Sequence, residues 1–368
     1  MRVTVVVPVG VRRGGAERTL EHLLMSEAAE AWQWRLVFLE DGPMVEQYRS
    51  AGLEVEVVPA GRLRQPHRVI ASVARLRRGM REWRPSLVLS WMPKAHLYAG
   101  PAAVLARTRC VWYQHDFPSP RGVFERTHAL IPADGVIATS KTVAAAQRAI
   151  RPSRRTIAVP PGVDLERFTP GDVAEARRNT GLPPGVPIVG MVARLQRWKG
   201  VHVLIEALPR LVDLVPDVQA VIVGGDDPQD PNHAEWLARR ATELGMADRV
   251  RFAGFHADPV PWMRAMDVVV NASRNEPFGL TVIEAMALGK PVVAVAEGGP
   301  TEVITDGEDG MLVPPGDPAA LAEAVARCLN DRELALRIGQ AAARRAADFS
   351  SAAYARRLMD ALTRLSEA

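Results

Sequence analysis

Short runs of apolar, β-forming residues alternate with helical patterns along the chain, and this alternation occurs twice. The first half contains the runs Val3–Val7, Leu36–Leu39, Val55–Pro59, Leu87–Ser90, Cys110–Tyr113, Gly135–Ala138 and Ile157–Val159. The second half contains Ile188–Val192, Ala220–Val223, Val250–Ala253, Val268–Ala272, Val292–Val295 and Met311–Val313. Many are apolar throughout, as strands are when helices cover both faces of a sheet. The pattern predicts an α/β protein with two parallel sheets, in two Rossmann-like domains with a cleft between them.

The length of 368 residues also favours two domains. Pro160-Pro161-Gly162, followed by a connector through Gly171, marks the boundary region. We predict a first domain over residues 1–168, a second over 169–350 and a final helical segment over 351–368.

No stretch approaches the ~20 apolar residues of a membrane span. The start, Met1–Pro8, is too short for a signal peptide and is predicted to be a buried strand, which favours a cytoplasmic protein. Cys110 and Cys328 are the two cysteines, and we expect both to be buried thiols in a reducing compartment.

One stretch of the second half, Glu276-Pro277-Phe278-Gly279-Leu280-Thr281-Val282-Ile283-Glu284, carries two carboxylates eight positions apart. It follows the apolar run Val268–Ala272, so it lies at the carboxyl end of a predicted strand, where doubly wound sheets bind ligands. Pro277 is expected to begin a helix and Gly289 to end it. The backbone amides of residues 278 to 280 would then be available to a phosphate.

The spacing of the two carboxylates suits a nucleotide sugar. If most of the stretch is helical, eight residues span roughly 12 Å. Glu276 and Glu284 would then bind hydroxyls at the two ends of a ligand that has a diphosphate in the middle. An amphipathic helix with two solvated glutamates is the alternative.

Two cations follow the first predicted strand of the second half. Arg194 and Lys199 lie in the loop after this strand, and a helix is expected to begin at Gly200. Cations beside a helix N-terminus would hold a diphosphate and stabilise negative charge as it leaves. A solvated surface loop is the alternative.

The first half offers two further candidates. Gly14 and Gly15 precede a helix expected near Glu17, and adjacent glycines let the backbone approach a ligand closely. Their spacing is neither G-x-G-x-x-G nor a P-loop, so a dinucleotide or ATP site is not indicated. His115 follows another strand and could bind a sugar hydroxyl or assist proton movement. A plain loop and a structural histidine are the alternatives.

Three aspartates, Asp226, Asp227 and Asp230, follow a predicted strand. Their spacing matches no EF-hand, and such runs usually form solvated turns. We therefore expect no metal site and no cofactor.

The order of these elements resembles the retaining glycosyltransferases of family 4. Gly14-Gly15, His115, Arg194…Lys199-Gly200 and Glu276-Pro-Phe-Gly-Leu…Glu284 occur in the order and the domains found in that family, so the likeness covers nearly the whole chain. The resemblance implies the GT-B fold, in which two domains face each other across a cleft and the C-terminal helix, here residues 351–368, crosses back onto the first domain. It also implies transfer of a hexose from a UDP- or GDP-sugar to an acceptor hydroxyl, by front-face attack with retention and without a covalent intermediate.

The same resemblance implies roles for individual residues, and family members typically need no divalent metal. The loop around Phe255 would contact the base, although it departs from the family's usual Gly-Asp-Gly pattern. Glu284 would bind the ribose hydroxyls. The implied catalytic residues are His115, Arg194, Lys199 and Glu276. The implied donor-binding residues are Gly14, Gly15, Arg194, Lys199, Phe255, Glu276, Phe278, Gly279, Leu280 and Glu284.

Positive charge is concentrated in the first half. Residues 1–170 contain 25 Lys and Arg against 15 Asp and Glu, whereas residues 171–368 contain 21 against 27, in agreement with the net charge of +4. Eight arginines lie between Arg62 and Arg84, where apolar residues recur near helical spacing. A basic amphipathic helix is typical of peripheral membrane contacts. Residues 62–84 are therefore a candidate contact with an anionic membrane at its inner face, unless the apolar stripe is the domain's own core face.

Two other functions fit parts of the sequence. A nucleotide-sugar epimerase can share the two-domain architecture but would need additional acid and base carboxylates. A nucleic-acid-binding protein would use the basic half, but the chain lacks the aromatic–basic interleaving of a known module, so no nucleic-acid partner is expected. The base, the sugar and the acceptor (lipid-linked, glycan or small metabolite) stay open.

Overall fold

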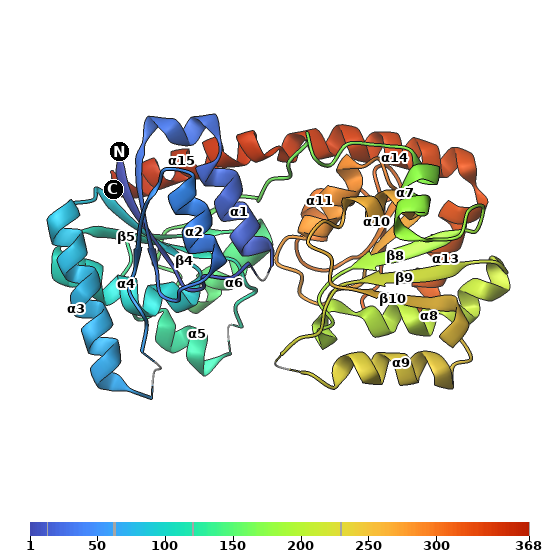
Figure 1. The fold of residues 1–368 in the computed structure, drawn as a ribbon, viewed down its shortest axis with the longest axis horizontal. Helices are drawn as coiled ribbons and strands as arrows, with labels where there is room; N and C mark the ends of the chain where they lie inside the picture. The colour runs from blue at the N-terminus through green and yellow to red at the C-terminus, as the bar shows by residue number, and fades with distance from the viewer. Residues whose placement is uncertain (13, 62–63, 120, 229, 368) are drawn as a thin grey trace. The chain divides into compact units, whose positions relative to one another are not determined.

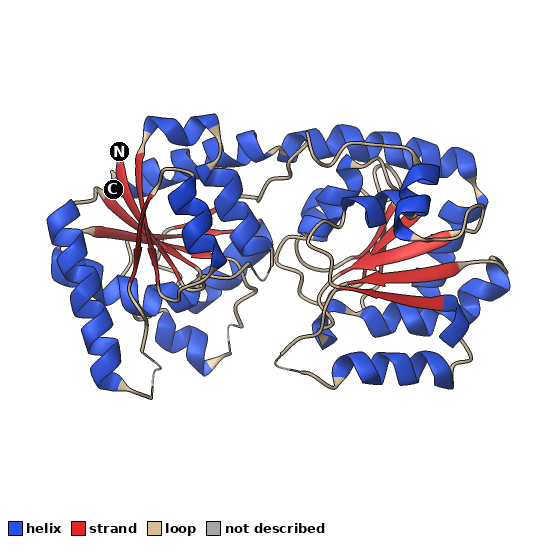
Figure 2. Cartoon of the chain, in the orientation of Figure 1, coloured by secondary structure: helices blue, strands red, loops and turns tan. Residues whose placement is uncertain are grey.

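The computed structural model describes residues 1–12, 14–61, 64–119, 121–228 and 230–367. They divide into two compact units: unit 1 comprises Met1–Gly162 and Ser351–Ala368, and unit 2 comprises Val163–Ser350. In each unit, helices cover both faces of a sheet (Figures 1 and 2). The prediction of two Rossmann-like parallel sheets is confirmed.

In the described residues, unit 1 has a seven-stranded parallel sheet in the order β3-β2-β1-β4-β5-β6-β7. Strand order reverses beside β1, which pairs with β2 on one side and with β4 on the other. The strands are β1 (Arg2–Val7), β2 (Gln33–Phe38), β3 (Glu54–Val57), β4 (Leu87–Trp91), β5 (Arg109–Gln114), β6 (Gly135–Ala138) and β7 (Thr156–Ala158).

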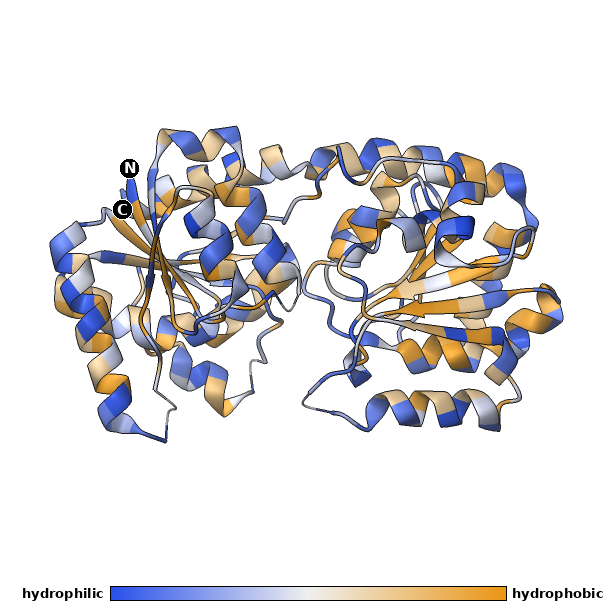
Figure 3. Cartoon of the chain, viewed as in Figure 1, coloured by the Kyte–Doolittle hydropathy of each residue, from blue (hydrophilic) through white to orange (hydrophobic). Residues whose placement is uncertain are grey.

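The helices of unit 1 bury core clusters on both faces of this sheet, two large ones and a small one between β6 and the helix that begins at Lys141. Leu358, Leu362 and Leu365 of the last helix are fully buried, because this helix packs beside the first helix of the chain. Apolar residues gather on the strands and on the inward faces of the helices (Figure 3). The helices are α1 (Gly15–Leu24), α2 (Pro43–Ser50), α3 (Pro66–Trp83), α4 (Pro93–Ala106), α5 (Val123–His128), α6 (Lys141–Ile150) and α15 (Ser351–Ser366), with a 3-10 helix at Glu27–Ala31.

In the described residues, unit 2 has a six-stranded parallel sheet in the order β10-β9-β8-β11-β12-β13. Here the order reverses beside β8, which pairs with β9 and with β11. The strands are β8 (Ile188–Val192), β9 (Gln219–Val223), β10 (Val250–Gly254), β11 (Val268–Asn271), β12 (Val292–Val295) and β13 (Met311–Val313).

Aspartate side chains cap the start of three helices of unit 2, those that begin at Val173, Pro318 and Arg332. Asp172 accepts the backbone amides of Ala174 and Glu175, and Asp317 accepts that of Ala320, with a proline following at the first helical position. The helices are α7 (Val173–Thr180), α8 (Val201–Leu214), α9 (His233–Glu243), α10 (Val260–Ala265), α11 (Leu280–Ala287), α12 (Pro300–Val303), α13 (Pro318–Asn330) and α14 (Arg332–Ala346). The 3-10 helices are Arg197–Lys199, Ala247–Arg249 and Ala347–Phe349.

The compact units divide after Gly162, earlier than the predicted first domain of residues 1–168. Val163 and Phe168 are each only 1% exposed and belong to a core cluster of unit 2. The backbone amide of Val163 also donates to the carbonyl oxygen of Phe349 at 2.7 Å. Residues just after Gly162 therefore belong structurally to the second unit.

Helix α3 carries most of the basic segment 62–84, of which Arg62 lies outside the described residues. Leu76 and Met80 are buried, and Val69 and Val73 pack against the same core cluster. The apolar stripe of this helix is thus the core face of unit 1, so it is not available for insertion into a membrane. Among the described helices, none combines the length and the hydropathy needed to span a bilayer.

Candidate functional site

The candidate site of unit 2 is formed by the loops at the carboxyl ends of β8, β9, β10 and β11. Helix α8, which follows β8, packs in one core cluster, and helix α11, which follows β11, packs in the other. The chain therefore leaves these two adjacent strands toward opposite faces of the sheet. Such a switch point is where doubly wound sheets form a ligand crevice.

Lys199 and Glu276 form an ion pair at this edge. The Nζ atom of Lys199 lies 2.8 Å from Oε2 of Glu276, and the two side chains are 18% and 8% exposed. The ammonium also lies 3.9 Å from the centre of the Trp198 ring. Burial of a charged pair requires that each charge be compensated, so this pair fixes a cation and a carboxylate at the end of the sheet.

Backbone contacts fix the loops that carry this pair. The amide of Arg274 donates to the carbonyl oxygen of Trp198 at 2.7 Å, which joins the loop after β11 to the loop after β8. Gly200 has φ +72°, and a Cβ there would overlap the carbonyl oxygen of Ala272. Only glycine combines this backbone angle with so close an approach.

The helix after Glu276 begins later than predicted. Helix α11 starts at Leu280 with Gly279 (φ +96°) as its N-cap, so Pro277 lies in the turn before the helix and not at its first position. The predicted distance of roughly 12 Å assumed a helix over most of the stretch, but only the part from Leu280 to Glu284 is helical. None of the amides of residues 278 to 280 donates to an acceptor among the described residues, so all three remain available to an anion.

The predicted residues in this stretch differ in what they offer. The ring of Phe278 is 3% exposed and packs 5.7 Å from that of Phe349, so its side chain belongs to the core and only its amide faces the site. Glu284 is a buried carboxylate, 2% exposed, in the second turn of α11. Arg194 is exposed, and its guanidinium has no partner in the described part of the chain.

The acidic run after β9 fastens the loop that holds the cations. Gln196 Nε2 donates to Asp227 Oδ2 at 2.6 Å, and Arg197 Nε donates to Asp230 Oδ2 at 2.8 Å. Asp227 is 7% exposed, so this part of the run is no solvated turn, contrary to our expectation. The described residues contain no group of three metal-ligating side chains. Sequence reasoning missed this fastening role because the two loops lie about thirty residues apart.

Phe255 lies in the loop after β10 and is 73% exposed. The amide of Gly224 donates to the carbonyl oxygen of Gly254 at 2.8 Å, so the loops after β9 and β10 are joined. A Cβ on Gly225 would lie 3.1 Å from that of Phe255. An aromatic face that projects from a fixed loop can stack on a planar ring.

The predicted residues of unit 1 lie after β1 and β5. Gly14 precedes α1, and Gly15 is the first residue of that helix. The backbone amide of Gly14 donates to Oε2 of Glu17 at 2.7 Å. His115 is 9% exposed, and its ring centre lies 4.0 Å from that of Tyr113. Burial lowers the pKa of His115 to about 3, so the ring is neutral near pH 7 and can accept or donate a hydrogen bond but is not an acid.

Trp91 links these two parts of unit 1, and sequence reasoning did not identify it. Its Nε1 donates to the carbonyl oxygen of Ala16 at 2.9 Å, and its ring lies 4.9 Å from that of His115. The His115 Nε2 atom is buried and has no hydrogen-bond partner among the described residues. A buried ring nitrogen of this kind calls for a ligand or water partner.

A second buried polar cluster in unit 1 lies apart from the predicted residues. Ser90 Oγ lies 3.2 Å from His96 Nδ1, and Cys110 Sγ lies 3.8 Å from the same atom. Burial raises the pKa of the Cys110 thiol to about 12 and lowers that of His96 to about 3. The thiol is therefore unreactive, and both cysteines are buried and free, as expected.

Two family models match the sequence over most of its length. One, described as Glycosyltransferase Family 4, matches residues 13–167, and the other, described as Glycosyl transferases group 1, matches residues 172–345.

Curated relatives match over part of their length. A D-inositol 3-phosphate glycosyltransferase of Stackebrandtia nassauensis is 40% identical over 207 residues, which are 54% of this chain and 46% of the relative. The protein of the same name from Corynebacterium urealyticum is 37% identical over 213 residues, 56% of this chain and 50% of the relative. The chain thus spans about half the length of the curated relatives it matches.

Solved structures match over nearly the whole chain. HepE of Anabaena, in complex with UDP-glucose, is 29% identical with a TM-score of 0.86 and coverage of 99% of each chain. A sucrose-phosphate synthase of Thermosynechococcus elongatus is 26% identical with a TM-score of 0.83, covering 99% of this chain and 98% of the other.

Proposed function

The chain belongs to the family 4 glycosyltransferases, which have the GT-B fold, and we propose that it transfers a hexose from a UDP-sugar to an acceptor hydroxyl. One observation carries the proposal. A buried Lys199–Glu276 pair lies at the switch point of the six-stranded sheet, with the exposed guanidinium of Arg194 in the same loop and available amides before α11.

The donor would lie along the carboxyl ends of β8 and β11. Arg194 and Lys199, with the amides of residues 278 to 280, supply positive charge for a diphosphate. Glu276 would accept hydrogen bonds from the transferred sugar, Glu284 from the ribose, and Phe255 would stack on the base. UDP is favoured over GDP because the Anabaena structure, 29% identical over 99% of its length, is a UDP-glucose complex.

We propose front-face transfer with retention of configuration. The acceptor hydroxyl attacks the anomeric carbon on the side from which the diphosphate leaves, and the leaving phosphate oxygen takes its proton. No side chain forms a covalent intermediate. The protein orients the reactants and stabilises the charge of the departing diphosphate through Arg194 and Lys199, the role that a divalent cation has in other transferases. Neutral His115 would hydrogen-bond a sugar hydroxyl.

D-inositol 3-phosphate is the first acceptor to test, because it appears in the names of the curated relatives. A lipid-linked sugar, a glycan and other small metabolites form the rest of the panel.

Thermal unfolding with UDP, GDP and ADP tests the donor site. A nucleotide at 100 times its dissociation constant stabilises the folded protein by about 2.7 kcal/mol. We expect UDP to give the largest shift, Glu284→Ala to lose that response, and Glu333→Ala, an exposed position on α14, to keep it. Equal shifts for all three nucleotides would contradict the proposed base.

Product analysis tests the reaction itself. With a UDP-sugar and the acceptor panel, NMR of the product should show the anomeric configuration of the donor, and EDTA should not change the rate. An inverted product contradicts front-face retention. Interconversion of the donor sugar without any acceptor would instead indicate an epimerase.

A further inference from the structure

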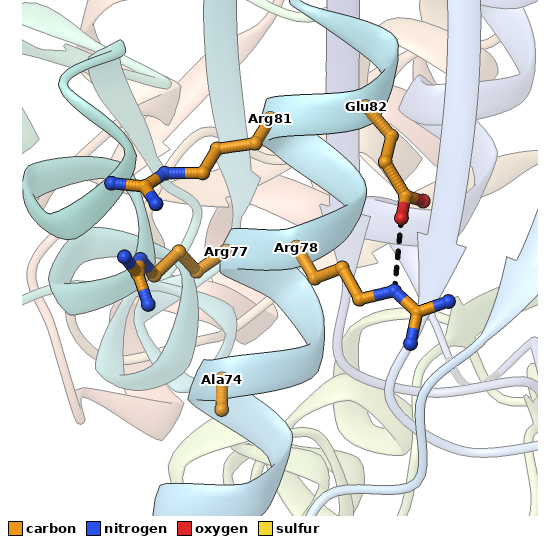
Figure 4. Close-up of a pocket in the computed structure, with 5 residues that line it drawn as sticks. All are labelled: Ala74, Arg77, Arg78, Arg81 and Glu82. Carbon is orange, nitrogen blue, oxygen red and sulfur yellow. Dashed lines mark hydrogen bonds and ion pairs between the residues drawn. The ribbon is translucent and has the colours of Figure 1, made fainter.

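The outward face of α3 carries cations that the proposed donor site does not use. Arg77, Arg78 and Arg81, together with Ala74 and Glu82, line a surface hollow of about 300 Å³ (Figure 4). Arg77 and Arg81 extend to the same side of the helix, whereas Arg78 turns to the other side, toward Glu82. Ala74, with its small side chain, lies one helical turn before Arg77 and Arg78.

Carboxylates neutralise little of this charge. Arg77 Nε and Arg81 Nη2 both donate to the carbonyl oxygen of Leu105 at 3.3 Å, near the C-terminal end of α4. Among the described residues, neither guanidinium contacts a carboxylate. Arg78 pairs with Glu82 at 2.9 Å, but the two side chains are 80% and 63% exposed. An exposed i,i+4 pair of this kind is weak and easily exchanged for another anion.

Exposed apolar side chains lie directly beside these cations. Val104 and Leu105 are 52% and 53% exposed. The Leu105 carbonyl oxygen accepts from both Arg77 and Arg81, so the backbone of this exposed leucine lies within hydrogen-bond distance of both guanidinium groups. Cations next to exposed apolar residues suit the boundary between lipid headgroups and acyl chains.

We propose that this face, defined as Ala74, Arg77, Arg78 and Arg81 of α3 with Val104 and Leu105 of α4, docks on the surface of a membrane rich in anionic phospholipid. Guanidinium groups bind phosphate headgroups, and the hollow accommodates one between the arginine arms. The core face of α3 stays packed in unit 1, so the contact is made by the surface of the folded unit. It differs from an inserted amphipathic helix in this respect.

The chemistry of the face favours lipid over nucleic acid. The face itself contains no aromatic side chain on which a base would stack. The nearby Trp83 is already engaged, since its Nε1 donates to Glu54 at 2.8 Å and Arg2 lies 4.4 Å from its ring centre.

Vesicle co-sedimentation of the full chain tests the proposal, independently of any transferase activity. The vesicles are phosphatidylcholine alone and an equimolar mixture of phosphatidylcholine and phosphatidylglycerol. We expect binding to the mixed vesicles only, weakening with salt. Because each arginine near an anionic surface contributes about a fivefold gain in affinity, R77Q/R78Q/R81Q should bind on the order of 100-fold more weakly. The variant V104S/L105S should bind the mixed vesicles about tenfold more weakly, because it removes apolar surface from the contact.

The matched control removes three exposed arginines from α14, as R332Q/R337Q/R344Q, and should leave binding unchanged. Unchanged thermal unfolding and UDP response in every variant show that folding is intact. Four results would overturn the proposal: equal binding to both vesicles, no binding to either, full displacement by inorganic phosphate at constant ionic strength, or tighter binding to duplex DNA than to vesicles. If the α14 control lost as much vesicle affinity as R77Q/R78Q/R81Q, the binding would depend on net charge and not on this face.

Discussion

Two glycines with nearly the same backbone angle show how a single residue sets the loops of unit 2. Gly200 and Gly185 have φ of +72° and +73°. A Cβ on Gly200 would overlap the carbonyl oxygen of Ala272, whereas no described residue lies within 4 Å of a Cβ on Gly185. The backbone strain of an alanine is therefore common to both positions, and the overlap is confined to Gly200.

We predict that Gly200→Ala lowers the free energy of unfolding by at least about 3 kcal/mol, because strain and overlap add. Gly185→Ala, the control, should lower it by about 1 kcal/mol through strain alone. Urea denaturation of both variants measures the difference. Equal losses would mean that the loops relax and that the close approach to Ala272 has no energetic weight.

We predict that Glu276→Gln lowers the turnover of UDP-sugar about 10² to 10³-fold while changing UDP affinity much less. The amide keeps the shape of the side chain, but it removes the charge that balances Lys199 and weakens the hydrogen bonds to the sugar. Steady-state kinetics and UDP titration separate the two effects. An unchanged turnover would exclude Glu276 from the proposed site, and Glu333→Gln on α14 controls for loss of charge.

For single residues, the sequence singled out Lys199 and Glu276 but did not predict the contact between them. Both were chosen because each follows a strand at the sheet edge where doubly wound sheets bind ligands. Their ion pair joins positions far apart in sequence and depends on the order of β8 and β11, which local spacing does not contain. The same reason hid the fastening role of Asp227. For Phe278 the sequence predicted a role for the backbone amide, and the buried side chain leaves that amide without an acceptor among the described residues.

At the element scale, a buried arginine ties the start of unit 2 to its sheet. Arg177 of α7 donates through Nη2 to Asp267 Oδ2 at 2.7 Å and through Nε to the carbonyl oxygen of Ala265 at 3.1 Å. The same carboxylate oxygen accepts the amide of Ile188 at the start of β8. This clip lies at the amino ends of β8 and β11, opposite the candidate site.

We predict that Arg177→Leu lowers the stability of unit 2 by about 1 to 2 kcal/mol, because it removes the buried partner of Asp267, whose carboxylate is 37% exposed and stays partly solvated. UDP affinity should not change, since the clip lies at the other end of the strands. Chemical denaturation and UDP titration test both statements. The exposed Arg332 provides the control as Arg332→Leu, and a loss of UDP affinity in Arg177→Leu would show that the two ends of the sheet are coupled.

Elements with strong local patterns were predicted well from sequence. All the expected strands are present with small shifts in their bounds, because continuous apolar runs between helices have few other solutions. The short elements were not predicted from the sequence. The 3-10 helix at Arg197–Lys199 and the late start of α11 at Leu280 depend on contacts with neighbouring loops, which override the local preference of Pro277 for a first helical position.

At the scale of the whole molecule, α15 completes unit 1. Leu362 is fully buried against that unit, whereas Leu336 of α14 is 55% exposed. We predict that Leu362→Ala costs about 3 kcal/mol of unit 1 stability and Leu336→Ala less than about 0.5 kcal/mol. The UDP-induced stabilisation of unit 2 should survive both. Calorimetry that shows equal effects of the two variants would contradict the assignment of α15 to the core of unit 1.

The buried histidines make unit 1 sensitive to acid. Burial lowers the pKa values of both His96 and His115 from 6.5 to about 3, so the unfolded chain binds protons that the folded unit does not. Stability is therefore complete above about pH 6.5 and falls as the pH drops toward 3, by about 1.4 kcal/mol per pH unit for each histidine. Denaturation at pH 7 and pH 5 measures this, with pH 8 as the control in which neither group titrates. A rise in stability at pH 5 would contradict it.

Unit 1 is built from two segments that are far apart in the chain, and this affects the order in which the units can fold during synthesis. The apolar residues that α15 covers are translated early, but the helix itself emerges only after all of unit 2 has been translated. At ~5–20 residues per second, the first unit waits on the order of ten to forty seconds with leucine-lined surface uncovered. In the growing chain, unit 2 can thus complete its core before unit 1 can.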